Sequence, residues 1–504
     1  MIVHKPDFDI WFVTGSQHLY GADTLEQVAR DSRAMVDGLN AAGTVPYPIV
    51  WKPTVTSAEE ISAVLEAATA DARSAGVITW MHTFSPAKMW IRGLSVLKKP
   101  LLQFHTQYNR DIPWASIDMD FMNLNQSAHG DREYAHITAR LGLKRGIVAG
   151  HWQDPETVRR VGVWARAAAA VTEGRSARFV RFGDNMRDVA VTDGDKVAAQ
   201  IRFGWSVNSY GVGELVQRVA RVTSADVDAL IDTYKRAYTI DAALLSDGKQ
   251  VERLKVQARL ELAIRAFLEE GRYRGFTTNF EDLYGLDQLP GLCAQRLMAD
   301  GYGFGAEGDW KTAALVRAMK LMADGLPGGT SFMEDYTYHL EREKSAVLGS
   351  HMLEICPSIA GGRPRIEIHP LGIGGKDDPA RLVFQAAPGE AVNASLVEFG
   401  DRFRLVVNEV KAIGAPHSMP KLPVAQAVWI PYPDFTTGVE GWLWSGGAHH
   451  TGYSTQICTE HLQVYADLLG LEFVRIGKGT SLEQVRTQLA LQELLALRAS
   501  AFGS

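Results

Sequence analysis

The segment WSGGAHHTGY, residues 444–453, places His449 and His450 side by side behind two glycines. An imidazole can bind a metal ion or transfer a proton near neutral pH, so the doublet is a candidate for chemistry. Adjacent side chains in an extended segment point to opposite faces, and we therefore expect at most one histidine to face a site. Two structural histidines are the plainer interpretation, and the doublet needs partners elsewhere in the chain.

Two glutamates and a third histidine are candidate partners. Glu307 stands between glycines in GFGAEG, Glu334 lies in the alternating segment SFMEDYTYHLE, and His351 opens the apolar stretch HMLEICP. Each residue alone is more readily explained as structural, and their spacing matches no local metal motif. Together, two carboxylates and two imidazoles would suit a divalent ion such as Mn²⁺, Co²⁺ or Fe²⁺. Zinc is less favoured, because its structural sites prefer thiolates and the three cysteines are far apart in the sequence.

The segment GFGAEG also matches the G-x-G-x-x-G pattern of dinucleotide-binding turns and leads into a helix-like segment. Against that interpretation, the Glu307 carboxylate would repel a pyrophosphate, and no acidic residue ends a strand at the expected distance. A nucleotide-dependent oxidoreductase is therefore the second hypothesis. The segment GIGGKDD fails as a phosphate-binding loop, because Asp377 follows Lys376 where serine or threonine is required.

Composition describes an ordinary globular protein that handles something small. The 504 residues are 46% hydrophobic and 22% charged, with a formal net charge of −6. This balance offers no basic surplus for nucleic acid or an anionic membrane. Three scattered cysteines fit a reducing compartment, the first residues lack the apolar run of a signal peptide, and no segment is apolar enough to span a membrane. We expect a cytoplasmic protein.

The order of segments predicts an α/β multidomain protein. Strand-like and helix-like segments alternate through the first third, which is typical of parallel sheets covered by helices. Alternating runs such as RIEIH and RFRLVVNEV then indicate a mostly antiparallel β domain, closed by two helices. We expect two doubly wound parallel-sheet domains, residues 1–176 and 177–326, followed by a C-terminal domain, residues 327–504.

Eight segments, in order along the chain, carry a resemblance to a known family. They are FVTGSQHLYG, MDFMNLNQSAHGDREY, GFGAEGDWKTAALVR, SFMEDYTYHL, LGSHMLEICPSIA, HPLGIGGKDDPARLVF, PHSMPKLPVA and GGAHHT. Together they closely resemble the L-arabinose isomerase family, from about residue 9 to about residue 455. The resemblance implies a C-terminal β-barrel and interconversion of L-arabinose and L-ribulose through a cis-enediolate, with D-galactose to D-tagatose as a second conversion.

The resemblance also implies roles for individual residues. Glu307, Glu334, His351 and His450 match the ligands of a divalent ion, usually Mn²⁺, with Co²⁺ or Fe²⁺ as substitutes. The two glutamates double as the catalytic pair, and His449 becomes a packing residue behind the metal. The positions that match sugar contacts are Gln17, Leu19, Tyr20, Gln126, His129, Met186, Phe280 and Ile373.

The family further implies a homohexamer whose active sites lie at subunit boundaries.

A non-catalytic sugar-binding protein on a doubly wound scaffold is the third hypothesis. It predicts sugar binding without turnover, whereas the oxidoreductase predicts NAD binding and the isomerase predicts loss of activity in EDTA with rescue by Mn²⁺.

Overall fold

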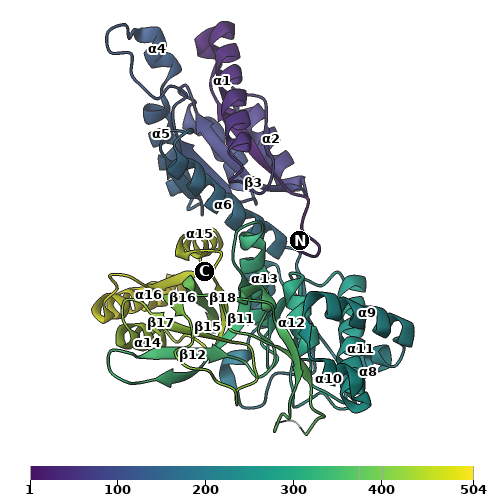
Figure 1. The fold of residues 1–504 in the computed structure, drawn as a ribbon. Coiled ribbons are helices and arrows are strands. Elements are labelled where there is room, and N and C mark those ends of the chain that lie inside the picture. The colour runs from purple at the N-terminus through teal and green to yellow at the C-terminus, as the bar shows by residue number, and fades with distance from the viewer. Residues whose placement is uncertain (1, 374, 401, 503–504) are drawn as a thin grey trace. The chain divides into compact units, whose positions relative to one another are not determined.

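The computed structural model describes residues 2–373, 375–400 and 402–502, with side chains up to residue 497. The chain divides into two compact units (Figure 1). The first unit comprises residues 6–174 and 460–470, and the second comprises residues 1–5, 175–459 and 471–504. The predicted central and C-terminal domains thus fall together in the second unit.

The first unit is built on a five-stranded sheet in the order β2-β1-β3-β4-β5, with every pair parallel. This order is one of the two common doubly wound arrangements, and its ligands lie beyond the carboxyl ends of the strands. The predicted parallel sheet is therefore confirmed. The strands are β1 (Asp9–Gly15), β2 (Ile49–Trp51), β3 (Ser74–Met81), β4 (Leu101–His105) and β5 (Gly146–Ala149). The helices are α1 (Gly21–Ala41), α2 (Ala58–Ala70), α3 (Ile91–Val96), α4 (Met119–Leu124), α5 (Ser127–Arg140) and α6 (Pro155–Gly174).

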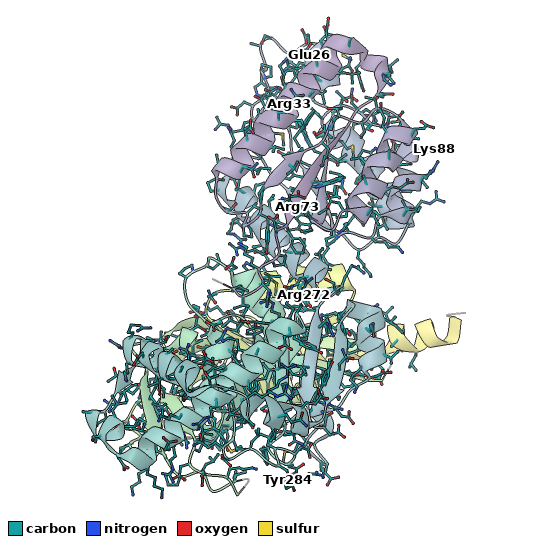
Figure 2. All side chains as sticks on the ribbon, turned by 90° about the vertical axis from the view of Figure 1, so that its right-hand side faces the viewer. Glu26, Arg33, Arg73, Lys88, Arg272 and Tyr284 are labelled. Carbon is teal, nitrogen blue, oxygen red and sulfur yellow. The ribbon has the colours of Figure 1, made fainter. Side chains whose placement is uncertain are left out.

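Both faces of this sheet are buried because successive side chains alternate between two cores. Ile10 and Phe12 of β1 join one apolar cluster, and Trp11 and Val13 join the other. Helix α1 shows the matching helical pattern: its buried residues include Val28, Met35 and Leu39 at helical spacing, whereas Glu26 and Arg33 are exposed on its outer side (Figure 2).

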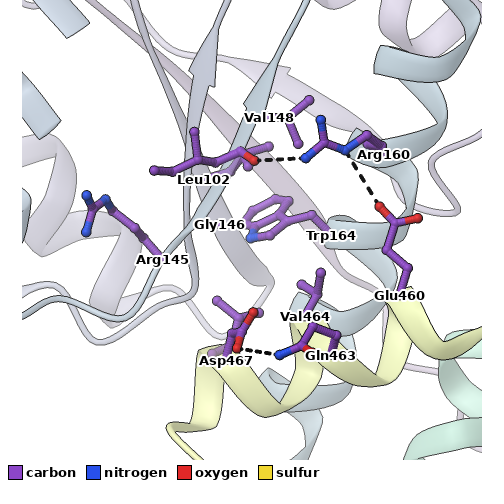
Figure 3. A pocket seen from close by; sticks show the side chains of 12 residues that line it. Leu102, Arg145, Gly146, Val148, Arg160, Trp164, Glu460, Gln463, Val464 and Asp467 are labelled. Carbon is purple, nitrogen blue, oxygen red and sulfur yellow. Dashed lines mark hydrogen bonds and ion pairs between the residues drawn. The ribbon is translucent and has the colours of Figure 1, made fainter. Parts of the chain in front are cut away.

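Helix α15 (Thr459–Leu469) belongs almost entirely to the first unit, although the sequence analysis placed it in the C-terminal domain. Val464 and Leu468 pack against the apolar cluster that contains Trp164 of α6. Figure 3 shows α15 beside Trp164, with Glu460 facing Arg160 across the intervening cavity. Val464 lies 300 residues after Trp164 in the sequence, and α15 thus completes the first unit by burying its apolar side chains there.

The second unit begins with a four-stranded parallel sheet in the order β10-β9-β6-β7. Its strands are β6 (Arg178–Phe182), β7 (Ser206–Tyr210), β9 (Gly275–Thr278) and β10 (Gly303–Gly305). The accompanying helices are α7 (Lys196–Phe203), α8 (Val212–Val219), α9 (Ser224–Ala237), α10 (Ala242–Ser246), α11 (Gly248–Glu270), α12 (Leu292–Ala299) and α13 (Trp310–Ala323). Every residue of α13 is buried, because the helix is enclosed by strands of both large sheets of this unit.

A seven-stranded sheet follows in the order β15-β18-β11-β12-β17-β16-β19, and all its pairs are antiparallel except β16 with β19. Strand β15 also pairs with β16. The predicted mostly antiparallel sheet is confirmed. Its strands are β11 (Thr330–His339), β12 (Ala346–Ser350), β15 (Gly389–Glu398), β16 (Phe403–Ile413), β17 (Gln426–Pro431), β18 (His450–Ser454) and β19 (Glu472–Ile476). This unit also holds a small sheet of β8 (Thr239–Ile240), β13 (Arg365–Ile368) and β14 (Ala380–Val383), with helices α14 (Phe435–Trp444) and α16 (Leu482–Phe502).

Among the helices in the described part of the chain, none is long and apolar enough to cross a bilayer.

Candidate active site

Glu307 is fixed in the turn between β10 and α13. Its backbone φ is 59°, in the left-handed region that non-glycine residues rarely adopt. The turn is anchored because the backbone amide of Met186 donates to the Glu307 carbonyl at 3.0 Å. Strained backbone of this kind costs of order 1–3 kcal/mol and often marks functional positions. The second unit thus holds one acidic side chain in a defined orientation.

Strand register brings Glu334, His351 and His450 together. Glu334 on β11 lies directly opposite His450 on β18 and, on its other side, opposite Ser350 on β12. His351 follows Ser350 immediately. Residues opposite each other on antiparallel strands have their Cβ atoms about 5 Å apart, so Glu334 and His450 lie side by side. His351 follows the end of β12, and its Nε2 atom approaches Glu334 from there.

The other three predicted side chains form one cluster with Glu307. The Nε2 atom of His450 lies 3.8 Å from Oε2 of Glu307, and Nε2 of His351 lies 3.8 Å from Oε2 of Glu334. Donor atoms of Glu307, His351 and His450 all lie within 4.8 Å of one another. Both histidines are buried, and the ring of Phe332 contacts each at a steep angle, with centroids 5.2 and 5.0 Å away.

A carboxylate holds the second nitrogen of each buried histidine. Nδ1 of His351 lies 2.5 Å from Glu354, and Nδ1 of His450 lies 3.1 Å from Asp309. A carboxylate at Nδ1 favours the proton on that nitrogen and leaves the Nε2 lone pair free to bind. This carboxylate–histidine arrangement is the usual support of a metal-binding imidazole.

His449 also lies at the cluster, which corrects the expectation that the doublet would point to opposite faces. Its Nε2 atom is 3.7 Å from Oε2 of Glu307. The expectation was wrong because β18 begins at His450, so His449 precedes the strand and is not subject to strand alternation. The His449 side chain is 37% exposed, whereas that of His450 is fully buried.

The acids and imidazoles of the cluster shift one another's pKa values. Burial alone would raise the pKa of Glu307, but the nearby imidazole of His449 and the charges of His450 and His351 outweigh it, so the pKa is lowered. Burial would likewise lower the pKa of His351, yet the charge and hydrogen bond of Glu354 raise it to about 9. The surrounding carboxylates therefore favour a positive charge at His351.

These residues fit a divalent cation. Nε2 of His450 is buried and has no hydrogen-bond partner among the residues that the structure describes. An unpaired buried nitrogen is costly unless another group binds it. A cation would satisfy that nitrogen and occupy the negative field that otherwise favours a proton on His351. Two oxygen and two nitrogen ligands suit a metal of intermediate character.

Comparison with known proteins identifies the family. The N-terminal, central and C-terminal domains described for L-arabinose isomerase match residues 4–176, 178–325 and 329–472. The chain belongs to the L-arabinose isomerase family. It is therefore an isomerase, as predicted, and neither the oxidoreductase nor the non-catalytic hypothesis retains support.

Close relatives of this L-arabinose isomerase family member span nearly its whole length. An L-arabinose isomerase of Geobacillus stearothermophilus is 58% identical over 97% of this chain and 98% of its own. Those of Anoxybacillus flavithermus and Nocardioides sp. are 57% and 55% identical over 98% and 97% of this chain. Among solved structures, a putative branched-chain amino acid ABC transporter from Rhodospirillum rubrum covers 66% of this chain and 73% of its own, at 13% identity. Its TM-score of 0.16 supports no argument.

The sugar-contacting residues expected near the N-terminus lie in the first unit, at the carboxyl ends of its strands. The Tyr20 hydroxyl donates to the Gln126 amide oxygen at 3.2 Å, which joins two of the expected loops. Gln17 precedes the same short turn, and Leu19 is 83% exposed. His129 on α5 packs against Phe84 with ring centroids 4.7 Å apart.

The expected residues of the second unit divide into two groups. Phe280 lines a small cavity together with Glu307 and His351, and Met186 contacts the Glu307 backbone as described above. Ile373 is 42% exposed, and no contact joins it to the cluster among the described residues.

Sequence reasoning missed Asp309 and Glu354. Both had a visible signal: Asp309 ends the motif GFGAEGD at the start of α13, and Glu354 lies three residues after His351. Asp309 also caps α13, because its side chain accepts from the backbone amide of Thr312.

Proposed function

We propose that this isomerase converts L-arabinose to L-ribulose, using Mn²⁺ held by Glu307, Glu334, His351 and His450. Co²⁺ and Fe²⁺ are chemically suitable substitutes. The observation that carries the proposal is the buried, unpartnered Nε2 of His450 beside Glu307, with carboxylates on the far nitrogens of both histidines.

Aldose–ketose interconversion requires a proton to leave C2 and arrive at C1 while another moves between O2 and O1. Two carboxylates whose surroundings separate their pKa values can perform both transfers. Glu307 has a lowered pKa, because His449, His450 and His351 favour its charged form, so it is available as a base. Glu334 faces the same cluster through His351 and completes the catalytic pair.

A divalent cation bound here would polarise the sugar carbonyl and stabilise the negative charge of the cis-enediolate. The chain's own residues then orient the reacting groups. His449 lies beside Glu307 and favours the charged form of that carboxylate, and Phe332 covers the buried histidines and excludes water from them.

Each unit carries part of the proposed set of sugar contacts. In the second unit, Met186 bonds the Glu307 backbone and Phe280 lines a cavity with Glu307. Ile373 is the third sugar contact that we propose in this unit. The proposed contacts of the first unit are Gln17, Leu19, Tyr20, Gln126 and His129. Exposed Leu19 is well suited to cover bound sugar, since an apolar side chain gains by leaving water.

Broader features of the proposal follow from the family. We expect the chain to act in arabinose catabolism, to accept D-galactose with D-tagatose as product, and to form a homohexamer with active sites at subunit boundaries. We also propose that the C-terminal sheet is a closed barrel, which the pairing of β15 with both β18 and β16 supports.

The proposal is tested by incubating chelator-treated protein with L-arabinose, with and without Mn²⁺, and assaying L-ribulose. Ketose formed only with metal supports the reaction and its metal dependence. Ketose formed equally without metal overturns the metal site, and no ketose under any metal overturns the reaction.

Paired histidine variants then test the ligand assignment. His450→Ala should abolish metal-dependent turnover, whereas His449→Ala should keep Mn²⁺ binding and slow catalysis. An exposed histidine of the first unit, His136, offers a matched control, and His136→Ala should leave both properties unchanged.

A further inference from the structure

An irregular loop, residues 279–291, forms part of the wall of the candidate active site. It follows the carboxyl end of β9, the edge at which parallel α/β sheets bind ligands, and leads into α12. Its residues form turns and bends rather than helix or strand, so contacts with other segments must fix its position. Three side chains of the loop line the small cavity that Glu307 and His351 also line: Phe280, Leu283 and Leu289. The shape of this cavity therefore depends on how the loop is held.

Lys376, in the segment GIGGKDD, holds this loop by its backbone. Its ammonium donates to the carbonyl oxygens of Leu283 and Leu286, each at 2.8 Å. Both leucines are buried, and buried carbonyl groups are costly to leave short of donors. The sequence of GIGGKDD does not match a phosphate-binding loop, and the structure gives its lysine a different use. Lys376 satisfies buried backbone groups of the loop and fixes their position at the same time.

The two residues after this lysine extend the contact. The backbone amide of Asp377 donates to the carbonyl of Asp287 in the loop at 2.9 Å. The carboxylate of Asp378 lies 2.7 Å from a guanidinium nitrogen of Arg253 on α11. Arg253 in turn accepts a hydrogen bond at its carbonyl from the side chain of Gln288, at 3.0 Å. Three consecutive residues are thus joined either to the loop or to a helix residue that also binds it.

A second cation, Arg187, binds the loop from the segment that follows β6. Its two terminal guanidinium nitrogens lie 2.8 Å from Glu281 and 3.0 Å from Asp282, and its backbone amide donates to Glu281 at 2.9 Å. A single exposed ion pair contributes little, but two carboxylates and a backbone amide form a network. Met186, whose amide donates to the Glu307 carbonyl, is the residue before Arg187. The loop is therefore held from two segments.

We propose that Arg187 and Lys376 are positioning residues: they hold the loop that carries Phe280 against the segments that carry Met186 and Ile373. The sugar role of this arrangement rests on the proposed function, in which those three residues contact the substrate. Arg187 directly follows Met186, and Lys376 lies three residues after Ile373, so each cation ties one proposed contact to the loop. A wall residue meets the sugar equally before and during reaction. Displacing the wall therefore weakens binding more than it slows the chemical step.

Kinetics of the Mn²⁺-loaded full-length chain with L-arabinose test Lys376. Lys376→Met keeps an unbranched stem and removes the donors, so KM should rise about 3- to 10-fold while kcat stays within about twofold. Lys376→Arg retains donors for both carbonyls and should restore most of the KM. Lys255→Met is the matched control, because Lys255 is a half-buried lysine of the same unit that pairs with Glu252 on α11. The control should leave KM and kcat unchanged.

Hydrogen exchange on the same chain measures how firmly the loop is held, without relying on catalysis. Loss of the charged donor in Lys376→Met should speed amide exchange across residues 279–291 about tenfold. Arg187→Gln should speed it about threefold, because solvent screens the ion pairs of an exposed arginine. This second variant keeps the test decisive if Lys376→Met does not fold. Arg475→Gln is its control, since Arg475 is a comparably exposed arginine of the same unit that pairs with Glu409.

Faster exchange with a raised KM and unchanged Mn²⁺ affinity supports the inference. Unchanged exchange in both Lys376→Met and Arg187→Gln would overturn it, and so would faster exchange with an unchanged KM. Parallel loss of kcat and Mn²⁺ affinity would also overturn it, because the contacts would then support the metal cluster rather than the wall. No turnover by the wild-type chain would instead overturn the proposed function and the sugar role with it, while exchange still reports whether the two cations hold the loop.

Discussion

The carboxylate of Asp309 lies 3.1 Å from Nδ1 of His450, and Nε2 of the same ring faces Glu307 at 3.8 Å. One imidazole therefore connects the capping residue of α13 to the candidate metal cluster. The proton on Nδ1 is directed to Asp309, so the nitrogen nearer Glu307 keeps its lone pair.

Replacing Asp309 by asparagine should weaken Mn²⁺ binding by about 10- to 100-fold. The amide can still cap α13 through its oxygen, but its nitrogen would donate to His450 and favour the wrong tautomer. Calorimetric titration of metal-free protein measures the affinity. Asp434→Asn is the matched control, because Asp434 caps α14 and accepts from Thr437 just as Asp309 accepts from Thr312. Equal Mn²⁺ affinity in both variants would contradict the role of Asp309.

Mn²⁺ should stabilise the folded chain. A ligand that binds only the native state, at 100 times its Kd, adds about 2.7 kcal/mol to the free energy of unfolding. Thermal unfolding with and without Mn²⁺ measures this difference as a shift in Tm. His450→Ala should lose the shift, and His449→Ala should retain most of it. Equal loss in the two variants would mean that the doublet binds as a pair.

Replacing Gly303 by alanine should destabilise the fold by about 1–3 kcal/mol. A Cβ atom at this position would lie 1.9 Å from the carbonyl oxygen of Ala313, so β10 and α13 could not approach as they do. Denaturant unfolding measures the loss. Gly414→Ala is the control, since its added methyl group meets open space. Equal stability of the two variants would show that α13 can shift without cost.

The His105–Asp131 pair should make stability depend on pH. The hydrogen bond to Asp131 raises the pKa of His105, so the folded state binds the proton more tightly than the unfolded state. This stabilisation is fully present below the unfolded pKa of about 6.5 and is lost as pH rises through the higher folded value. NMR titration of His105 measures the shift, which Asp131→Asn should remove. A pKa of His105 at or below 6.5 in the wild-type chain would contradict the prediction.

Local sequence patterns predicted the class of each sheet correctly. The run at residues 9–15 and the alternating helix-like segments specify a buried parallel strand and its covering helix, because apolar periodicity decides which faces leave water. They could not show that α15 packs on the first unit. Its apolar residues Val464 and Leu468 need a partner surface, but no pattern in the neighbouring sequence indicates that this surface contains Trp164.

The residues of the candidate site were predicted, but the way they meet was not. Resemblance to the family identified Glu307, Glu334, His351 and His450, whereas strand register explains why they meet: Glu334 pairs with His450 across β11 and β18.

Sequence alone thus determined the elements, the family and the residue types of the site, because these depend on periodicity and motif. Tertiary structure alone decided that both histidines of the doublet approach Glu307 and that Asp309 and Glu354 orient the imidazoles. These relationships join positions far apart in the chain, and their distances are fixed by packing and strand register rather than by local preference.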